Sequence, residues 1–370
     1  MALCLFALLA FEFVISSQGL PGGFHHRAPF KTSGPYSIAH RGANGEFPES
    51  TVPAFKRAIQ EGIDIIETDI GATKDGFLIC LHDTTLDAIT DVAQRPEFAS
   101  RRATYPVEGE NITGFFAVDF TLDEIKSLRV HQRYEFRDQA YNGMYQIPTF
   151  EEYIAIALEA PRVVGIDPEI KNPVFINKHV TWPHGKLFED KYVETLLKYG
   201  YNAPYLSESW LQQPIFIQSF APLSILRVAN QTKSPKIFNI GRDTDLAQDT
   251  LQPYSELSSD AYLDFIKSYV AGISTDKNTI APIDETTGRL SPPSDIVDRA
   301  HVRGLMIHPA TFRNEAQFMA KDFRADPYRE FDYFLQGLRV DAVMTDFPST
   351  LTSYMNAIAK SPDLWKSCEV

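Results

Sequence analysis

Short apolar runs that end in polar or charged residues recur along the whole chain, and this pattern limits the possible folds most strongly. Nine such runs occur: YSIAHR, DIIETDI, FLICLH, VVGIDPEIK, PIFIQSF, KIFNIGR, AGIST, GLMIHP and DAVMTDFP. Each has the length and composition of a buried strand. Amphipathic helical patterns such as TVPAFKRAIQEG and TFEEYIAIALEA lie between many of them. The alternation predicts a β/α barrel or a doubly wound parallel sheet.

Nine strand candidates are one more than an eight-stranded barrel holds, and the turn between the second and third runs explains the extra strand. The linking sequence GATKDG contains Asp75-Gly76, a tight-turn signal, so these two runs are predicted to form a hairpin. Residues 84–162 form a long excursion, which we expect to cover or wall the barrel mouth. No linker divides the chain, which indicates one domain over residues 36–355 and a tail over 356–370.

The charge and the N-terminus restrict the partners and the compartment. A formal net charge of -13 argues against nucleic-acid binding, which needs a basic face. Residues 1–19 resemble a signal peptide with an apolar core too short to span a bilayer comfortably, although Glu12 interrupts it and no basic residue precedes it. A membrane anchor or a buried helix is the alternative. Asn111-Ile-Thr and Asn230-Gln-Thr are glycosylation sequons that fit a secreted protein.

Two carboxylates in the second run suggest a cation site. Glu67 and Asp69 are two residues apart, so on a strand they face the same side. Adjacent buried carboxylates raise each other's pKa unless a cation lies between them, and a hard cation with oxygen ligands is suitable. With a tight hairpin, His82 falls roughly opposite Glu67. The alternative is a solvated edge strand with ordinary surface acids.

The run GIDPEIK repeats this arrangement. Asp167, Glu169 and Lys171 share one face of the predicted strand. The order of acid, acid and lysine fits a metal ligand followed by a phosphate-binding cation. A salt-bridged exposed strand is the alternative, although the preceding RVVGI has the composition of a buried segment.

His40 and Arg41 stand side by side where the first strand ends. A lone histidine there is more often structural than catalytic, but Arg41 has the bidentate geometry that suits a phosphate. Histidine also titrates near neutral pH and acts as a general acid or base. Together with the acids, the lysine and His82, these residues describe metal-assisted chemistry on a phosphoester.

Later strands end in further polar residues. Gln218 in IQSF is suited to hydrogen-bond a substrate hydroxyl, and His308 in MIHPATFRNE is a further candidate for substrate binding. Asp346 in TDFP is predicted to cap the final helix rather than to take part in catalysis. Phosphate loops with GK[ST], GxSxG elbows, HExxH motifs and paired CxxC motifs do not occur in the sequence.

The ordered set of motifs resembles the glycerophosphodiester phosphodiesterase family. The motifs are HRGANGEFPESTVPAF, IETDIGATKDGFLICLHD, DPEIK, IQSF, HPATFR and TDFP, and the segments DVA and DFTLDEIKSL resemble the extracytoplasmic subtype of plants and bacteria. The resemblance implies a single eight-stranded TIM barrel with an insertion after the second catalytic histidine. It implies hydrolysis of glycerophosphodiesters such as glycerophosphocholine to sn-glycerol 3-phosphate and an alcohol, with a role in lipid turnover and phosphate recycling.

The resemblance also assigns roles to individual residues. It implies that His40 and His82 are the acid-base pair and that Arg41 and Lys171 are phosphate-binding cations. The implied metal ligands are Glu67, Asp69 and Glu169, holding Ca²⁺ or Mg²⁺. Two other functions stay open: a phospholipase of the same barrel type acting on intact lipid, and a non-catalytic barrel that binds cell-wall polymer. The sequence does not decide whether the nucleophile is water or the substrate's own hydroxyl. It does not decide the oligomeric state either.

Overall fold

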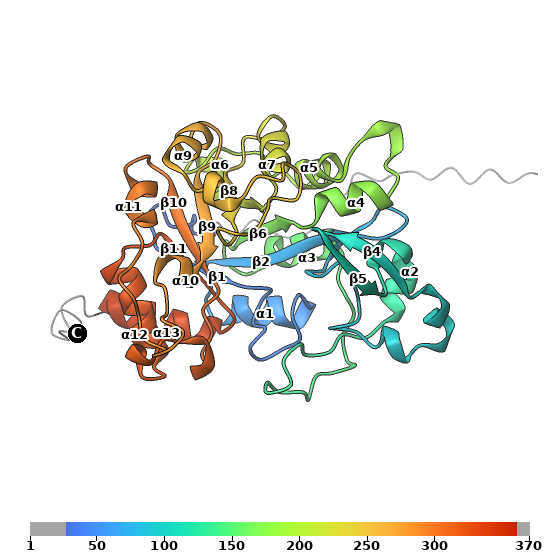
Figure 1. Cartoon of the computed structure of the whole chain (residues 1–370), viewed down its shortest axis with the longest axis horizontal. Coiled ribbons are helices and arrows are strands. Elements are labelled where there is room, and N and C mark those ends of the chain that lie inside the picture. Colours follow the sequence, from blue (N-terminus) through green and yellow to red (C-terminus); the bar gives the residue numbers. More distant parts are fainter. Residues whose placement is uncertain (1–26, 361–370) are drawn as a thin grey trace, which may run out of the picture.

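Eight parallel strands form the centre of the molecule in the computed structural model, which describes residues 27–360 (Figure 1). They are β1 (Tyr36–Ala39), β2 (Ile65–Ala72), β6 (Gly165–Ile170), β7 (Ile217–Ser219), β8 (Lys236–Ile240), β9 (Gly272–Asp276), β10 (Met306–Ala310) and β11 (Ala342–Thr345). They pair in the order β10-β9-β8-β7-β6-β2-β1-β11. Phe312, just after β10, donates its N–H to the Met344 carbonyl of β11 at 2.9 Å, which nearly closes the sheet. The predicted β/α barrel is confirmed.

Helices follow most of the strands and cover the outside of the barrel (Figure 1). They are α1 (Val52–Gln60), α3 (Phe150–Leu158), α4 (Pro173–His179), α5 (Phe188–Lys198), α6 (Glu208–Gln212), α7 (Pro222–Ala229), α8 (Tyr254–Leu257), α9 (Asp260–Ile266), α10 (Lys277–Ile280), α11 (Ile296–His301), α12 (Pro327–Asp332) and α13 (Pro348–Lys360). Thr51 caps α1 by accepting a hydrogen bond from the Ala54 N–H. The predicted tail, 356–370, begins inside α13, and its last ten residues lie outside the described part. Across residues 27–360, no helix is both long and apolar enough to cross a membrane.

The third apolar run forms the predicted hairpin. Strand β3 (Leu78–Cys80) pairs antiparallel with β2, with Ile70 opposite Cys80. The alternation of side chains explains why this run is apolar throughout. Leu78 and Cys80 belong to the barrel core, whereas Ile79 and Leu81 belong to a second, smaller core. The hairpin therefore joins the barrel to this second core.

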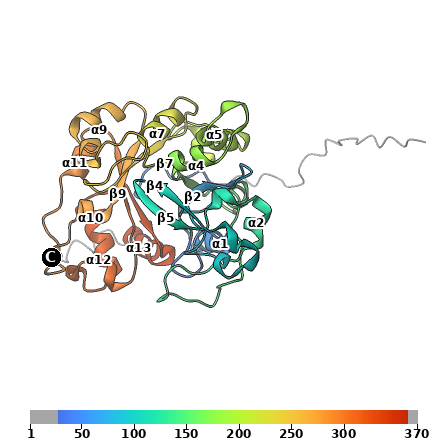
Figure 2. The same cartoon turned by 45° about the vertical axis from the view of Figure 1, so that its right-hand side comes forward.

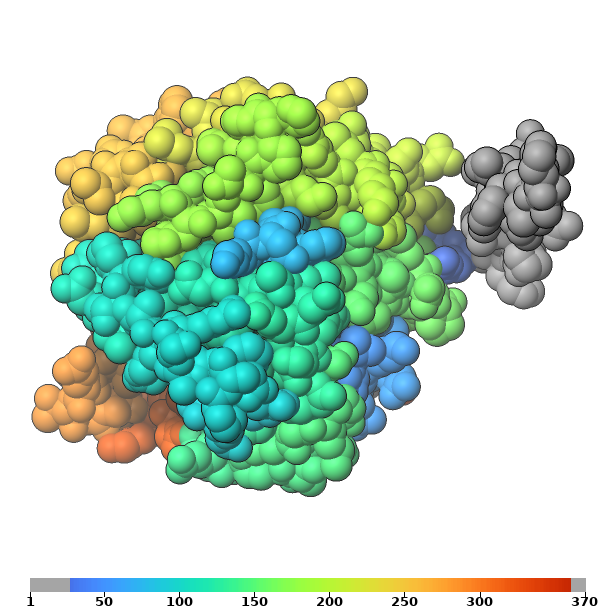
Figure 3. Space-filling model, turned by 90° about the vertical axis from the view of Figure 1, so that its right-hand side faces the viewer, coloured from blue at the N-terminus to red at the C-terminus, as the bar shows by residue number. Residues whose placement is uncertain are grey.

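The segment predicted as an insertion, residues 84–162, has two parts. Its first part holds β4 (Ala103–Val107), β5 (Glu110–Gly114) and α2 (Leu122–Ser127) and supplies most of the second core. In Figures 1 and 2, β4 and β5 lie beside the end of β2. This part forms a continuous cyan-to-teal area of the face shown in Figure 3. Its second part, α3, packs on the barrel, where the Tyr153 hydroxyl donates to the Ile66 carbonyl at 2.6 Å.

Candidate active site

A cavity of about 220 Å³ lies at the carboxyl ends of the barrel strands. Eight predicted site residues line it: His40, Arg41, Glu67, Asp69, His82, Glu169, Lys171 and Gln218. The carboxyl ends of the strands are where the side chains of a β/α barrel converge on a substrate. The strand patterns therefore located most of the candidate site.

His308 lies elsewhere. It is fully buried inside the barrel, with its ring edge-on to Phe216 and the ring centroids 5.1 Å apart. Burial lowers the pKa of His308 to about 4, so its ring is neutral at physiological pH. The structure places His308 outside the lining of the cavity, whereas the prediction placed it at the substrate.

The three predicted metal ligands come from two neighbouring strands in matching register. Asp69 of β2 pairs with Glu169 of β6, and Glu67 lies one inward-facing position earlier on β2. All three side chains are buried. Burial and the neighbouring Asp69 charge raise the pKa of Glu67 well above its usual range. Burial also raises the pKa of Glu169 to about 7, against the opposing charge of Lys171. The arrangement gathers three acids in a buried space, where ionised carboxylates repel one another.

Two cations lie among these carboxylates. Arg41 adopts a left-handed backbone with φ 54°, which turns its N–H toward Glu67 Oε2 at 2.7 Å. Its Nε lies 3.1 Å from Asp69 Oδ2. Lys171 Nζ lies 3.0 Å from Glu169 Oε1 and 3.5 Å from Asp69 Oδ1. Both side chains thus face the cavity as partners for an anion as well as for the acids.

The donor set suits a hard cation in its chemistry. Asp69 Oδ2 and Glu169 Oε1 are buried oxygens with ion-pair contacts that lack hydrogen-bond geometry. Carboxylate oxygens of this kind are the ligands that Ca²⁺ and Mg²⁺ take. Within the described residues, however, no three acid or histidine side chains are gathered as the ligands of one ion. Arg41 and Lys171 lie between the carboxylates in this arrangement.

His40 is held by an aspartate from the far end of the chain. Its Nδ1–H donates to Asp346 Oδ1 at 2.6 Å, which leaves Nε2 for the cavity. Burial raises the pKa of Asp346. The hydrogen bond from His40 and the charges of Arg313 and Arg137 outweigh burial and hold this pKa far below its usual range. Burial and the Arg41 charge lower the pKa of His40. The prediction that Asp346 caps the last helix is wrong, because its carboxylate binds His40, Asn44 and two arginines instead.

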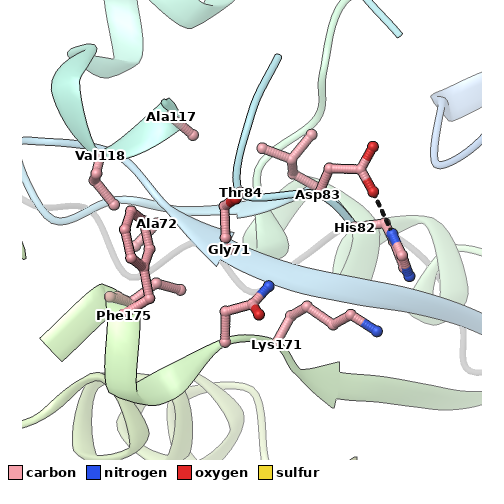
Figure 4. A pocket seen from close by; sticks show the side chains of 12 residues that line it. Gly71, Ala72, His82, Asp83, Thr84, Ala117, Val118, Lys171 and Phe175 are labelled. Carbon is pink, nitrogen blue, oxygen red and sulfur yellow. Dashed lines mark hydrogen bonds and ion pairs between the residues drawn. The ribbon is translucent and has the colours of Figure 1, made fainter. Parts of the chain in front are cut away.

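His82 has the same kind of support from Asp83. Its Nδ1–H donates to Asp83 Oδ1 at 2.5 Å, and Figure 4 shows this bond. In Figure 4 the His82 ring and the Lys171 ammonium point away from the apolar side chains of Val118 and Phe175. Burial and the charge of Arg41 lower the pKa of His82 to about 4. Each histidine thus carries its proton on Nδ1, and its Nε2 forms no hydrogen bond with any of residues 27–360.

The predicted pairing of His82 with Glu67 is wrong by one residue. The β2–β3 ladder runs through Ile70 opposite Cys80, and continuing this register would place His82 opposite Thr68. The ladder ends there, after Leu81 donates its N–H to the Asp69 carbonyl at 2.9 Å. The chain then turns, and this turn brings His82 to the cavity.

Two arginines of the insertion support the site from outside, and no sequence pattern indicated them. Arg133 Nη1 donates to Asp83 Oδ2 at 2.8 Å, and its Nε donates to Glu49 Oε2 at 2.6 Å. Glu49 Oε1 in turn accepts from Arg41 at 3.1 Å. Arg137 donates to Asp346 Oδ2 at 2.8 Å. The insertion therefore reaches both histidines through their aspartates.

Glu49 is a site residue that a local pattern does not reveal. It belongs to the PEST sequence, whose composition indicates only a helix start, and it is buried between the two guanidinium groups. Burial raises the pKa of Glu49, but the charges of Arg41 and Arg133 outweigh burial and keep this pKa below its usual range. A buried charge with two such partners fixes the orientation of Arg41.

Comparisons with known proteins agree with this geometry. The glycerophosphoryl diester phosphodiesterase family model matches residues 40–350. The chain is 57% identical over 345 residues to glycerophosphodiester phosphodiesterase GDPD6 of Arabidopsis thaliana, covering 93% of this chain and 92% of that protein. A phosphodiesterase of Oleispira antarctica, solved with the product sn-glycerol-3-phosphate, matches with a TM-score of 0.56 at 18% identity, covering 87% of this chain and 97% of that one. A glycerophosphodiester phosphodiesterase of Agrobacterium tumefaciens matches with a TM-score of 0.50 at 18% identity, covering 86% and 99%.

Proposed function

This chain belongs to the glycerophosphoryl diester phosphodiesterase family, and we propose that it hydrolyses glycerophosphodiesters to sn-glycerol 3-phosphate and an alcohol. The observation that carries the proposal is the pair of histidines at one cavity, each with Nδ1 bound to an aspartate. The product named for the Oleispira antarctica structure supports the same substrate class. Such a reaction serves lipid turnover and phosphate recycling.

The phosphate of the substrate would take the place between the two cations. Arg41 and Lys171 would each donate to its non-bridging oxygens, because both side chains line the cavity. Substrate binding then competes with their present contacts to Asp69 and Glu169. Gln218 would hydrogen-bond a glycerol hydroxyl from the same cavity.

The two histidines would move the protons. One Nε2 accepts the proton of the attacking hydroxyl as its oxygen bonds to phosphorus, and the other histidine, protonated, gives a proton to the leaving alkoxide as the P–O bond breaks. The lowered pKa values of His40 and His82 favour the neutral form that the base requires, so the histidine that acts as the acid has to gain its proton against this shift. The nucleophile is water or the substrate's own glycerol hydroxyl. The second route gives a cyclic phosphate, which ³¹P NMR under slow turnover would detect.

A divalent cation completes the proposal. Glu67, Asp69 and Glu169 would hold Ca²⁺ or Mg²⁺, since their buried oxygens are suited to a hard cation. When bound, the ion would neutralise charge on the phosphate. Equilibrium dialysis with each metal should show binding to the wild type and a loss of at least about tenfold in Glu67→Gln, a change of roughly 1.4 kcal/mol. Equal binding by both proteins would contradict this ligand set.

The activity test uses the whole purified chain. Glycerophosphocholine and a divalent metal should give glycerol 3-phosphate, with at least about a hundredfold less from the folded Glu67→Gln variant. Glu208→Gln, at an exposed residue of α6 before β7, is the matched control and should keep full activity. Wild-type protein that releases no more product than Glu67→Gln would refute the proposed reaction.

We further propose that the chain enters the secretory pathway and is glycosylated. The predicted signal peptide, residues 1–19, lies outside the described residues, and the support comes from its sequence and from the sequon at Asn111, which is exposed on β5. In a eukaryotic host, the full chain should appear in the medium with a shift in mobility after endoglycosidase treatment. Retention inside the cells, equal to that of a chain starting at residue 20, would overturn this proposal.

A further inference from the structure

A second, larger cavity adjoins the catalytic one. We propose that it holds the leaving alcohol and selects alcohols that carry a positive charge; this inference rests on the proposed phosphodiesterase function. The second cavity measures about 650 Å³. We call it the outer cavity, defined by Glu108, Glu110, Asp245, Leu246 and Tyr254 together with its other lining residues.

The two cavities meet at the catalytic residues. His82, Glu169, Lys171 and Phe220 line both of them. A phosphate bound by Lys171 at this junction would direct one half of the diester into each cavity. The smaller cavity is lined by short polar side chains such as Asn239, Ser274 and Thr275, which suit the hydroxyls of glycerol. The outer cavity therefore receives the alcohol.

The insertion supplies part of the outer cavity. Glu108 and Gly109 form the two-residue turn between β4 and β5, and both have positive φ, 49° and 87°. This turn type keeps the two strands twisted together and fixes the position of Glu108. Glu108 Oε1 accepts a hydrogen bond at 3.1 Å from Gln248 of the loop between β8 and α8. The hairpin thus bridges to the barrel beside the cavity.

The lining carries an excess of negative charge. Asp83 is paired with Arg133, and Glu169 with Lys171. Within the described part of the chain, Glu108 and Glu110 take part in no ion pair. Asp245 is paired with Arg242, whose side chain is 81% exposed, so water screens that cation strongly. Beside a neutral alcohol, Glu108 and Glu110 would have no ion-pair partner among the described residues, and Asp245 would have only the exposed Arg242.

Apolar and aromatic groups lie next to the acids. Val107 and Ile112 of the hairpin line the cavity together with Phe220 and Tyr254, whose rings meet edge to face at 6.3 Å between centroids. Tyr254 is held in place because its hydroxyl donates to the Phe220 carbonyl at 2.7 Å. Lys171 Nζ already lies 5.3 Å from the centre of the Phe220 ring, which shows that this ring accepts a cation. Acids beside aromatic and aliphatic surface suit an alkylammonium group, which is both charged and apolar.

The test compares two substrates that differ in the charge of the alcohol. The full chain is assayed on glycerophosphocholine and on glycerophosphoglycerol, and wild-type kcat/KM should favour the first by about tenfold. In the double variant Glu108→Gln/Asp245→Asn, the preference should fall about fivefold through KM for glycerophosphocholine, while activity on glycerophosphoglycerol stays within about twofold. Glu208→Gln is the matched neutralisation far from the cavity and should change neither substrate.

The outcomes separate this inference from the proposed function. Hydrolysis of neither substrate would refute the phosphodiesterase function itself. Hydrolysis of both with no preference, or a preference that the double variant retains in full, would overturn the charge-selective outer cavity and leave the phosphodiesterase function standing. A circular dichroism spectrum and a melting curve for each variant exclude a folding defect as the cause.

Discussion

Replacing Asp346 by asparagine should abolish the proton-transfer function of His40 while the chain stays folded. In the wild type, Oδ1 of Asp346 accepts from His40 at 2.6 Å and from Asn44 at 2.9 Å. Oδ2 accepts from Arg137 at 2.8 Å and from Arg313 at 3.0 Å. Asparagine has the same shape but only one acceptor oxygen. The amide must therefore turn its NH₂ group toward one of these two pairs.

The arginines decide the orientation of the new amide. Both are charged donors that cannot accept, so the amide oxygen should face Arg137 and Arg313. The NH₂ group then faces His40 and donates to Nδ1, which moves the imidazole proton to Nε2. A neutral ring with its proton on Nε2 cannot accept a proton from a nucleophile. It is also a poor acid, because the carboxylate that stabilised the imidazolium is gone.

The expected loss follows from the role of the group. General acid-base catalysis contributes about 10²–10⁴-fold. We expect kcat to fall by about 10³-fold, or roughly 4 kcal/mol in activation free energy. Stability should fall less, by about 2 kcal/mol, because Arg137 keeps its contact with Glu315 at 2.7 Å.

The assay is release of glycerol 3-phosphate from glycerophosphocholine, with thermal melting as the measure of folding. Asp64→Asn is the matched control, since Asp64 accepts from Ser37 at 2.8 Å just before β2, at the opposite end of the barrel. His40→Ala/Asp346→Asn should be no slower than His40→Ala, because both changes remove the same function. A folded Asp346→Asn protein with more than a tenth of the wild-type kcat would refute the tautomer argument.

Three further predictions concern other parts of the chain. Arg133→Met should lower kcat about tenfold or more in the same assay, because Asp83, which holds His82, loses its cation. Arg95→Met is the control: it removes an ion pair to Asp91 within the insertion and should leave kcat unchanged. Gly42→Ala should lower the free energy of unfolding in urea by at least about 2 kcal/mol more than Gly62→Ala: both have positive φ, but only at Gly42 would the new Cβ meet backbone, 2.7 Å from the Ala54 carbonyl carbon. Lys236→Met should raise stability by about 2 kcal/mol at pH 7, because burial lowers the pKa of Lys236 to about 8. The wild type gains stability as the pH rises from about 8 toward the unfolded pKa near 10.4, so the advantage of the variant should shrink over that window. A difference in stability that stays constant with pH would contradict the burial argument.

Most of the barrel could be predicted because its signals are local. Nine apolar runs became strands, and Asp75-Gly76 indicated the hairpin that places β3 beside β2. The alternation of side chains along a strand also fixed which residues share a face, so Glu67 with Asp69 and Glu169 with Lys171 reached one cavity. The error of one residue at His82 arose in the turn, because the ladder pairs Ala72 with Leu78 and the turn between them is one residue longer than the tight hairpin that the prediction assumed.

The depth of a residue inside the barrel could not be predicted in the same way. His308 ends an apolar run as His40 does, yet it lies in the packed interior against Phe216. Periodicity gives the face of a strand, whereas the stagger between strands determines how far along the barrel axis each side chain lies. That stagger is a property of the closed sheet.

The sequence by itself thus determined the strands, their inward faces and the residue types at the carboxyl ends. The tertiary structure alone decided how those residues are held. Asp346 lies 306 residues from His40, and Arg137 reaches it from an insertion whose own sequence has no strand-end pattern. The physical reason is that buried charges take their partners from whatever part of the chain packs beside them, and packing joins segments whose separation along the sequence carries no signal.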